Sequence, residues 1–307
     1  MGKALLLTLG LVSSLCVSSY RAGADVVDDH NIAGNHPTSG ATSHFTLLQD
    51  RLAIESPEVI TGQELCGYQV LYLTTFLQWA APDVYKGAWK DSFNPTRQVC
   101  GGNASNGYGS AVWARAQGYS PNNWTGTLPN QSGFAEVKGY ACTEAGQFAG
   151  RYVACSVHFW SDPYWNSGTR VSTLDWYTTN VLNVVYLARG RVVASGDLYM
   201  SQTAMGAVTG YFSSWKDSFN CASPSYSSGT YKYSTSLADQ DDHIWFNSGG
   251  VSCQASGTAY HRCSSPTDFE TCNYSDHQLV YSSLNYMQLD NVQLRPQHSN
   301  KCADVTG

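Results

Sequence analysis

The sequence predicts one α/β domain, on three observations. Segments with the pattern of strands alternate with segments that have the pattern of helices along much of the chain. Hydrophobic residues make up 42% and charged residues 13% of the 307 residues, which excludes a long disordered polyelectrolyte. No linker rich in proline and serine divides the chain, so we expect one domain over residues 25–289 and a C-terminal tail at 290–307.

The individual elements follow from periodicity, from strand-forming residues and from the prolines that end helices. The segments with the pattern of helices are 45–54, 69–79 and 172–187. The segments with the pattern of strands are 58–62, 153–159, 191–195, 242–246 and 279–284. Glu64 is expected at the far end of the first of these strands.

The first 24 residues have the pattern of an export signal. Lys3 supplies the positive start, the stretch from Ala4 to Val17 is mostly apolar, and Ala22-Gly23-Ala24 is a small-residue cleavage site. The apolar stretch is too short to span a membrane, and no other stretch reaches the roughly 20 apolar residues that a spanning helix needs. We therefore expect residues 1–24 to be a signal peptide and the mature protein to be secreted and monomeric, with no transmembrane segment.

The charge balance limits the class of partner. Without residues 1–24, 15 basic residues stand against 23 acidic ones, a net charge of −8. A protein that binds nucleic acid mainly by counterion release has a basic surplus instead. If the substrate is a phosphate polyanion, local groups and bound cations must offset the overall repulsion.

Nine cysteines follow the leader. In an exported chain, dispersed cysteines favour disulfides over zinc, and no Cys-x-x-Cys pair is present. Cys142 and Cys155 enclose a glycine-containing stretch, so we expect a disulfide across a hairpin there. Cys66 with Cys100 is a second candidate pair. The odd number leaves at least one thiol free or bonded to another chain.

Polar side chains that suit acid–base chemistry or metal binding follow the apolar segments: Asn31, Glu64, His158, Asp197, Asp242, Asp276 and His277. In an α/β sheet the carboxyl ends of the strands share one rim, where ligands bind. Four carboxylates on such a rim repel each other unless a cation lies among them, and oxygen ligands suit Mg²⁺, Mn²⁺ or Ca²⁺ rather than zinc. Histidines in that cluster can serve as base and acid. This set predicts metal-assisted phosphoryl chemistry, and no motif of acyl transfer, of a Walker loop or of a zinc protease is present.

Six short motifs, in a fixed order over roughly residues 28–286, resemble those of the endonuclease/exonuclease/phosphatase superfamily, which has the DNase I-like fold. They are His30-Asn31-Ile32-Ala33-Gly34, Val59-Ile60-Thr61-Gly62-Gln63-Glu64-Leu65-Cys66, Ser156-Val157-His158-Phe159, Ser195-Gly196-Asp197-Leu198-Tyr199, Asp242-His243-Ile244-Trp245-Phe246 and Tyr274-Ser275-Asp276-His277. The resemblance implies a four-layer sandwich of two packed β-sheets flanked by helices.

The resemblance also implies a metal site. Glu64 is similar to the family's metal-binding glutamate, and Asn31 to its metal-site asparagine. Asp276 and Asp197 then complete the shell around the metal and the phosphate. A divalent cation in this shell neutralises charge that develops on the phosphoryl oxygens.

The remaining motif residues are implied to move protons. His277 takes the proton of the attacking water and is oriented by Asp242, while His158 protonates the leaving oxygen. One position departs from the family, because its Gly-Asp-x-Asn motif ends here in Tyr199. A phenol reaches farther than an amide and offers one hydroxyl, and the loss of one stabilising contact costs on the order of 10²–10³ in rate. The motifs assign no glutamate to orient His158.

The resemblance implies a secreted, divalent-metal-dependent phosphodiesterase, most of all an endonuclease that leaves 5′-phosphates on nucleic acid. One alternative uses the same site on a phospholipid head group, as sphingomyelinase-like relatives do. Trp160, Tyr164 and Trp165 could then reach the bilayer, or they could stack on bases. A third alternative is a catalytically impaired binding or effector protein, because of Tyr199. Taken singly, each site residue also has a structural interpretation, as a turn residue, a solvated strand end or a satisfied buried histidine.

Overall fold

The computed structural model describes twelve stretches of chain and the single residues Cys100 and His277. The stretches are 25–31, 57–80, 84–92, 107–116, 120–129, 136–145, 152–160, 167–205, 215–225, 241–247, 251–259 and 279–286. Several predictions from the sequence lie outside these residues. They are the signal peptide, the helix at 45–54, the tail at 290–307, and the positions of Tyr164, Trp165 and Asp276.

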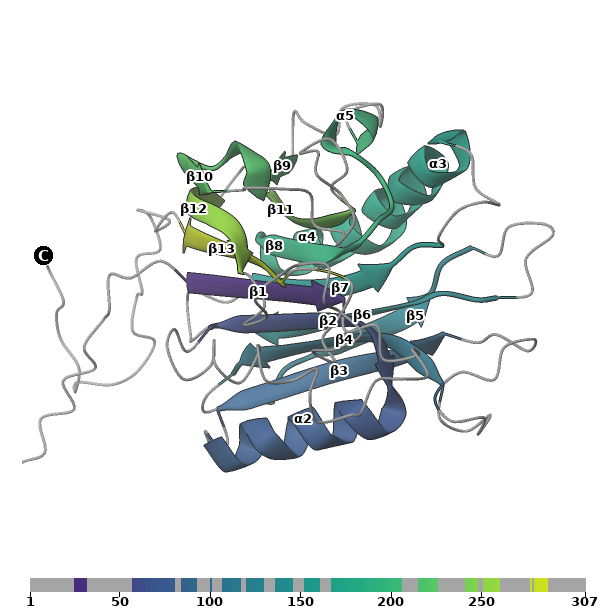
Figure 1. Ribbon diagram of the computed structural model, residues 1–307, viewed down its shortest axis with the longest axis vertical. Helices are drawn as coiled ribbons and strands as arrows, with labels where there is room; N and C mark the ends of the chain where they lie inside the picture. Colours follow the sequence, from purple (N-terminus) through teal and green to yellow (C-terminus); the bar gives the residue numbers. More distant parts are fainter. Residues whose placement is uncertain are drawn as a thin grey trace, which may run out of the picture.

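One sheet has seven strands in the order β10-β12-β13-β1-β2-β4-β3 (Figure 1). Strand β1 is central, pairs in parallel with β2 and is antiparallel to β13. The strands are β1 (Asp25–Asn31), β2 (Val59–Cys66), β3 (Tyr85–Ser92), β4 (Tyr108–Arg115), β10 (Ser223–Ser225), β12 (Val251–Ala259) and β13 (Leu279–Tyr286).

The other sheet has six strands in the order β5-β6-β7-β8-β11-β9. Strands β7 and β8 are parallel and central, and β11 is antiparallel to β8. The strands are β5 (Asn123–Thr127), β6 (Gly139–Ala145), β7 (Tyr152–His158), β8 (Val192–Asp197), β9 (Trp215–Asp217) and β11 (Asp242–Asn247).

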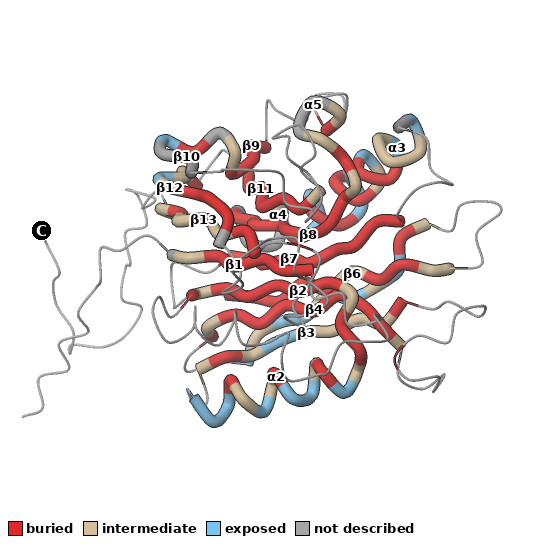
Figure 2. Tube along the Cα trace, viewed as in Figure 1, coloured by how far each residue is buried: buried red, intermediate tan, exposed pale blue. Residues whose placement is uncertain are grey.

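The two sheets pack face to face around an apolar core. Val27, Val59 and Val112 of the first sheet lie in one buried cluster with Ile244 and Phe246 of the second. Because packed helices cover the outer faces as well, the central strands are buried on both sides, as Figure 2 shows. Burial on both faces explains why β7 and β8 have continuous runs of small and β-branched residues instead of an alternating pattern.

Helices form the two outer layers (Figure 1). Helix α2 (Gly67–Ala80) packs Leu73 and Leu77 on the first sheet. Helix α3 (Ser167–Tyr177), the π-helical turn η3 (Thr178–Leu182) and α4 (Asn183–Arg189) run without a break over the second sheet, and α4 ends at Gly190, whose φ of 76° suits glycine. The short helix α5 (Gln202–Met205) and the 3₁₀ turn η4 (Ser218–Asn220) complete the described elements. The expected four-layer α/β sandwich is confirmed.

The predicted elements that fall in the described residues are present. The helix expected at 69–79 is α2, the helix expected at 172–187 is the composite α3–η3–α4, and the strands expected at 153–159, 191–195, 242–246 and 279–284 are β7, β8, β11 and β13. The strand expected at 58–62 continues to Cys66, so Glu64 lies within β2 and not beyond its end. Eight strands were not predicted, namely β1, β3–β6, β9, β10 and β12. Among the described residues, no helix combines the length and the apolar character that crossing a bilayer requires.

Three disulfides lie among the described residues. Cys142–Cys155 and Cys66–Cys100 confirm the two expected pairs, and Cys221–Cys253 is a third that was not predicted. Cys142 and Cys155 are directly opposed residues of β6 and β7, so this bond crosses between neighbouring strands.

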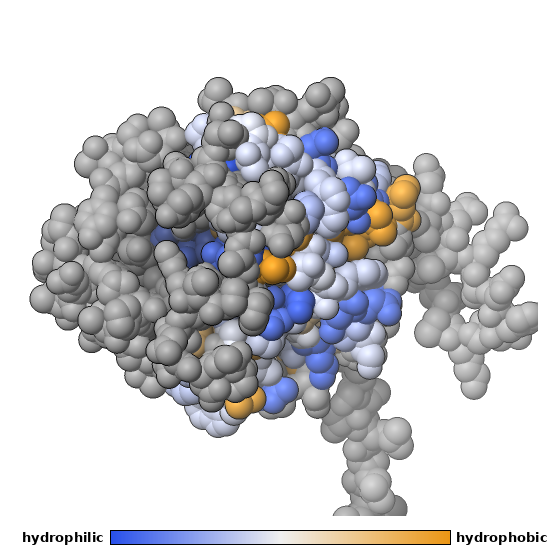
Figure 3. Space-filling model, turned by 90° about the vertical axis from the view of Figure 1, so that its right-hand side faces the viewer, coloured by the Kyte–Doolittle hydropathy of each residue, from blue (hydrophilic) through white to orange (hydrophobic). Residues whose placement is uncertain are grey.

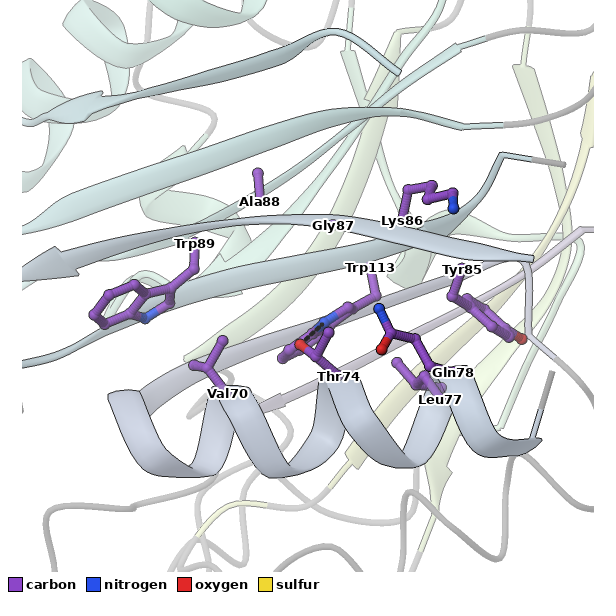
Figure 4. Close-up of a pocket in the computed structure, with 10 residues that line it drawn as sticks. All are labelled: Val70, Thr74, Leu77, Gln78, Tyr85, Lys86, Gly87, Ala88, Trp89 and Trp113. Atoms are coloured by element: carbon purple, nitrogen blue, oxygen red, sulfur yellow. Dashed lines mark hydrogen bonds between the residues drawn. The ribbon is translucent and has the colours of Figure 1, made fainter. Parts of the chain in front are cut away.

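A hollow of about 250 Å³ lies between α2 and strands β3 and β4 (Figure 4). The indoles of Trp89 and Trp113 line its sheet side, and Nε1 of Trp113 donates to Oγ1 of Thr74 on the helix, 2.9 Å away. Its described lining holds no carboxylate and no imidazole. The described lining of this hollow therefore lacks the carboxylate and imidazole ligands that a metal site of the expected kind needs.

Candidate active site at the strand ends

Strand register brings three of the predicted residues together in the second sheet. Asp197 ends β8 and is the cross-strand partner both of His158, which ends β7, and of Asp242, which begins β11. All three are buried. Because β7 and β8 are parallel, their carboxyl ends meet at one rim, as expected from the sequence.

The first sheet contributes the facing residues. Asn31 ends β1, and its amide nitrogen donates to Oδ2 of Asp197 at 2.8 Å, which joins the two sheets. His277 lies just before β13, and Nε2 of His30 is 3.1 Å from its backbone carbonyl oxygen. Asn31 is thus held at the end of β1, and His277 is held beside this strand. Both lie close to Asp197 at the end of β8.

Glu64 reaches the same rim through an irregularity in β2. The pairing of β2 with β4 shifts register between Gly62 and Leu65, and Glu64 has a φ of 53° in the left-handed region. Such a bulge turns one side chain away from the regular alternation of a strand. Oε1 of Glu64 consequently lies 3.6 Å from Nε2 of His158.

Gly196 permits the close approach of β8 to β7. A β-carbon at this position would lie 1.8 Å from the carbonyl oxygen of Val157, which no side chain tolerates. The glycine therefore allows Asp197 to stand beside His158 at the ends of the two strands.

His277 is paired with a carboxylate. Its Nδ1 lies 2.7 Å from Oδ2 of Asp242, and its Nε2 lies 3.7 Å from Oδ2 of Asp197. A carboxylate accepts hydrogen bonds only, so Nδ1 carries the hydrogen and Nε2 presents its lone pair towards the site. This is the arrangement that a histidine base requires.

His158 has a cation in the corresponding place. Nζ of Lys138 lies 3.4 Å from Nδ1 of His158, and Nε2 of His158 is 3.7 Å from Oδ2 of Asp197. Burial, together with the charges of Lys138 and His277, holds the pKa of His158 well below its ordinary value. The sequence reasoning missed Lys138, which stands in no motif.

The carboxylates of the rim suit a divalent cation. Asp197, Asp242 and His277 each offer a ligand atom, and these atoms lie within 4.8 Å of one another. Burial, and next the charge of Asp242, raise the pKa of Asp197 well above its usual range, against the opposing effects of His277 and the Asn31 amide. A hard cation would offset this repulsion, so the group suits a divalent metal, although only Asp197 among its three members belongs to the metal shell expected from the sequence. Glu64 and Asn31 stand at the same rim, whereas Asp276 lies outside the described residues.

A polar network lies beneath the rim, between the sheets. Oδ1 of Asp29 accepts from Oγ1 of Thr61 at 2.5 Å and from Nε2 of Gln63 at 2.7 Å, and Thr61 also contacts Oγ of Ser195 at 2.6 Å. Burial, and next the charge of Asp242, raise the pKa of Asp29 to about 7. Asp29 was not singled out from the sequence, although it stands two residues before Asn31 on the same side of β1.

Tyr199 stands beside His158. Its ring centroid is 5.8 Å from the His158 ring, its φ is 49°, and its backbone carbonyl accepts from the guanidinium of Arg170. Burial, with the charges of Asp197 and Glu64, raises the pKa of Tyr199 well above its usual value. Its phenol therefore remains protonated at the position where the Gly-Asp-x-Asn motif has an amide.

Comparison with solved structures identifies the fold. A Bacteroides thetaiotaomicron endonuclease/exonuclease/phosphatase family protein is similar over 87% of this chain and 98% of its own, with a TM-score of 0.61 and 16% identity. The human Nocturnin catalytic domain with bound sulfate matches 87% of this chain and 95% of its own, with a TM-score of 0.61 and 14% identity. TDP2 of D. rerio, complexed with a single-strand DNA product, matches 85% of this chain and 98% of its own, with a TM-score of 0.55 and 14% identity.

Comparison of the sequence with known families and proteins finds no relative. No protein-family model matches the chain, and no curated protein is significantly similar to it. At identities this low, the structural similarity establishes architecture and not activity. The chain has the DNase I-like fold, the fold of the endonuclease/exonuclease/phosphatase proteins.

Proposed function

We propose that this protein is a secreted, divalent-metal-dependent phosphodiesterase that hydrolyses nucleic acid and leaves 5′-phosphates. The observation that carries the proposal is the pair of buried imidazoles on either side of Asp197. Nε2 of His277 and Nε2 of His158 each lie 3.7 Å from Oδ2 of Asp197, and the groups on their Nδ1 atoms are of opposite charge. One imidazole is prepared to accept a proton and the other to offer a hydrogen, which hydrolysis of a P–O bond requires.

On the attacking side, His277 takes the proton of the water. Asp242 holds the hydrogen on Nδ1 of His277 and stabilises the imidazolium that forms. His30 fixes the backbone of His277 through the contact with its carbonyl oxygen. The lone pair on Nε2 is therefore directed at the site before it takes the proton.

On the leaving side, His158 offers its Nε2 hydrogen to the departing oxygen, and Tyr199 supplies a hydroxyl to a phosphate oxygen. A divalent cation, Mg²⁺ or otherwise Mn²⁺ or Ca²⁺, held by Glu64 and Asn31 with Asp197 and Asp276, neutralises charge on the phosphoryl oxygens when bound. The negative charge of the mature chain makes such a cation necessary for a polyanionic substrate.

Nucleic acid is the substrate class that we favour. The TDP2 structure carries a single-strand DNA product, so this architecture can accommodate a DNA strand in that protein. Three disulfides among the described residues support secretion, because such bonds persist in oxidising compartments.

The phospholipid alternative loses one of its supports. Trp160 is 2% exposed, and its Nε1 donates to the backbone carbonyl of Glu136, so it is not available to enter a bilayer. Figure 3 faces the end of the molecule where β1 terminates, and most described residues visible there are hydrophilic or neutral on the hydropathy scale. The described residues of this face therefore suit a polar substrate.

A chelator-controlled substrate screen tests the proposal. The refolded, disulfide-bonded protein is incubated with plasmid DNA or with sphingomyelin vesicles, in Mg²⁺ or Mn²⁺ and in parallel with chelator. We expect nicking of DNA that chelator abolishes and 5′-phosphate ends on the products. Release of choline phosphate would instead identify the phospholipid alternative, and silence with both substrates would favour an effector without catalysis.

A further inference from the structure

A buried lysine stands directly behind one of the two site histidines. Lys138 immediately precedes β6 and is 3% exposed, and its backbone carbonyl accepts from the amide of Leu128 at 2.9 Å. Its Nζ lies 3.4 Å from Nδ1 of His158. Lysine is rarely this buried unless it is paired, so the position of Lys138 beside a histidine of the site indicates a function for this contact.

Besides His158, the side-chain nitrogen of Lys138 contacts two further residues, Glu136 and Tyr108. Nζ lies 2.9 Å from Oε1 of Glu136 and donates to the hydroxyl of Tyr108 at 3.1 Å. The same atom is 4.9 Å from the centroid of the Tyr108 ring, within the range of a cation–π interaction. Tyr108 comes from the first sheet and Lys138 from the second, so the ammonium group bridges the two sheets at the rim.

The charge on Lys138 decides which nitrogen of His158 bears the hydrogen. An ammonium group has three donors and no acceptor, so the short contact is favourable only if Nδ1 accepts. The ring hydrogen is then on Nε2, which lies 3.6 Å from Oε1 of Glu64 and 3.7 Å from Oδ2 of Asp197. An imidazolium would turn an Nδ1–H towards the ammonium, donor against donor and cation against cation.

We propose that Lys138 is a positioning residue that fixes His158 as the neutral tautomer with its hydrogen on Nε2. His158 then stabilises the leaving oxygen as a neutral hydrogen-bond donor, and not as an imidazolium acid. The kinetic part of this inference rests on the proposed phosphodiesterase function, whereas the tautomer itself does not.

The tautomer is measured by NMR on the intact, disulfide-bonded protein with ¹⁵N-labelled histidine. The ring signals of His158 are those that vanish in His158→Gln. We expect an unprotonated Nδ1 and a protonated Nε2 in the wild type and in Lys138→Arg, and a gain of Nδ1–H signal in Lys138→Met. Lys216→Met, at an exposed position of β9, is the matched control and should leave the His158 signals unchanged. A protonated Nδ1 in the wild-type spectrum overturns the proposal, even if Lys138→Met fails to fold.

Kinetics separate a donor from an acid. A glutamine amide can donate a hydrogen bond but cannot transfer a proton at neutral pH, so we expect His158→Gln to keep at least tenfold more activity on DNA than His158→Ala. We expect Lys138→Met to lower kcat by about 10- to 100-fold with little change in KM, and Lys138→Arg to restore most of it. Equal losses in His158→Gln and His158→Ala would contradict the donor role. An inactive wild type with the expected NMR spectrum would refute the proposed function but leave the tautomer assignment in place.

Discussion

The two histidines of the site have similar positions and opposite environments. Both are buried, and both place Nε2 3.7 Å from the same oxygen of Asp197. On the far side of each ring the partners differ, since Nδ1 of His277 meets the Asp242 carboxylate at 2.7 Å and Nδ1 of His158 meets the Lys138 ammonium at 3.4 Å.

This difference shows that the partner of Nδ1 decides whether Nε2 of the same imidazole carries a hydrogen or a lone pair. A carboxylate beside Nδ1 keeps the hydrogen on Nδ1, so Nε2 turns a lone pair to the site. An ammonium group beside Nδ1 donates to it, so the ring hydrogen is on Nε2. Two histidines can therefore serve as the base for the attacking water and as the hydrogen-bond donor to the leaving oxygen, although their side chains are identical. Two experiments test this contrast directly, and a third tests the buried network beneath both rings. They follow from the largest expected effect on turnover to the smallest.

Removal of His277 should have the largest effect. We expect His277→Ala to lower the rate of DNA cleavage in Mg²⁺ by on the order of 10²–10⁴, because a positioned base contributes that much. The fold should persist, since the ring packs at the rim of the sheets and not in the core between them. The rate is measured by plasmid nicking and the fold by circular dichroism.

His158→Ala is the matched comparison for that variant. It should lose less than His277→Ala, because a neutral hydrogen-bond donor contributes less than a base that removes the proton. If His277→Ala retained full turnover, the assignment of the base would be wrong, and a larger loss in His158→Ala would reverse the order of the two rings.

Replacement of Tyr199, which lies beside His158, should raise the rate of DNA cleavage instead of lowering it. We expect Tyr199→Asn to raise kcat about tenfold or more, since an amide contact in such a site is worth on the order of 10²–10³. Asparagine also tolerates the φ of 49° at this position better than tyrosine does. The variant and the wild type are compared on the same DNA at saturating Mg²⁺. An unchanged or lower rate would mean that the phenol already performs the role of the amide.

Asp29→Asn should change turnover least and should act on the pH dependence of stability instead. The pKa of Asp29 in the folded protein is about 7, raised from 3.8 by burial and by the charge of Asp242. Between these two pH values the folded state holds a proton that the unfolded state has released, so the free energy of unfolding falls as pH rises from about 4 to about 7. Above that window the ionised, buried carboxylate is a standing cost on the order of a few kcal/mol.

Asparagine removes this ionisation and keeps an oxygen for the hydrogen bonds from Thr61 and Gln63. We therefore expect Asp29→Asn to flatten the loss of stability between pH 4 and pH 7, and to be more stable than the wild type at pH 8. Urea unfolding in the presence of chelator, at several pH values, measures the effect. A slope equal to that of the wild type would show that another group titrates there.

Much of the fold could be predicted because the central strands are visible in the sequence as short runs of strand-forming residues. β7, β8 and β11 are short runs of strand-forming residues buried on both faces, and the polar residues at their ends, His158, Asp197 and Asp242, stand out against them. His158 and Asp197 end their strands, as expected, whereas Asp242 begins β11 and reaches the same rim only because β11 is antiparallel to β8. Strands β4 and β6 escaped prediction because glycine, serine and alanine give them low strand propensity, which their pairing with two neighbours each overrides.

The parts of the site that were missed depend on contacts between distant segments. Lys138 follows no apolar run, and only the pairing of β6 with β7 brings it to His158. The left-handed backbone of Glu64 arises from a register shift against β4, which no local pattern indicates. Asp29 is one of several acids in a short segment of the sequence, and its importance comes from its burial between the sheets.

The bond between Cys142 and Cys155 has a consequence for how the site matures. It joins opposed residues of the two strands that carry Lys138 and His158 to the rim. A slip of β6 by a single residue would turn its side chains to the opposite face and separate the ammonium from the imidazole, and the covalent link forbids that slip. Formation of this disulfide is therefore an assembly step for the Lys138–His158 contact, and protein in which these two thiols stay reduced lacks this constraint on strand register.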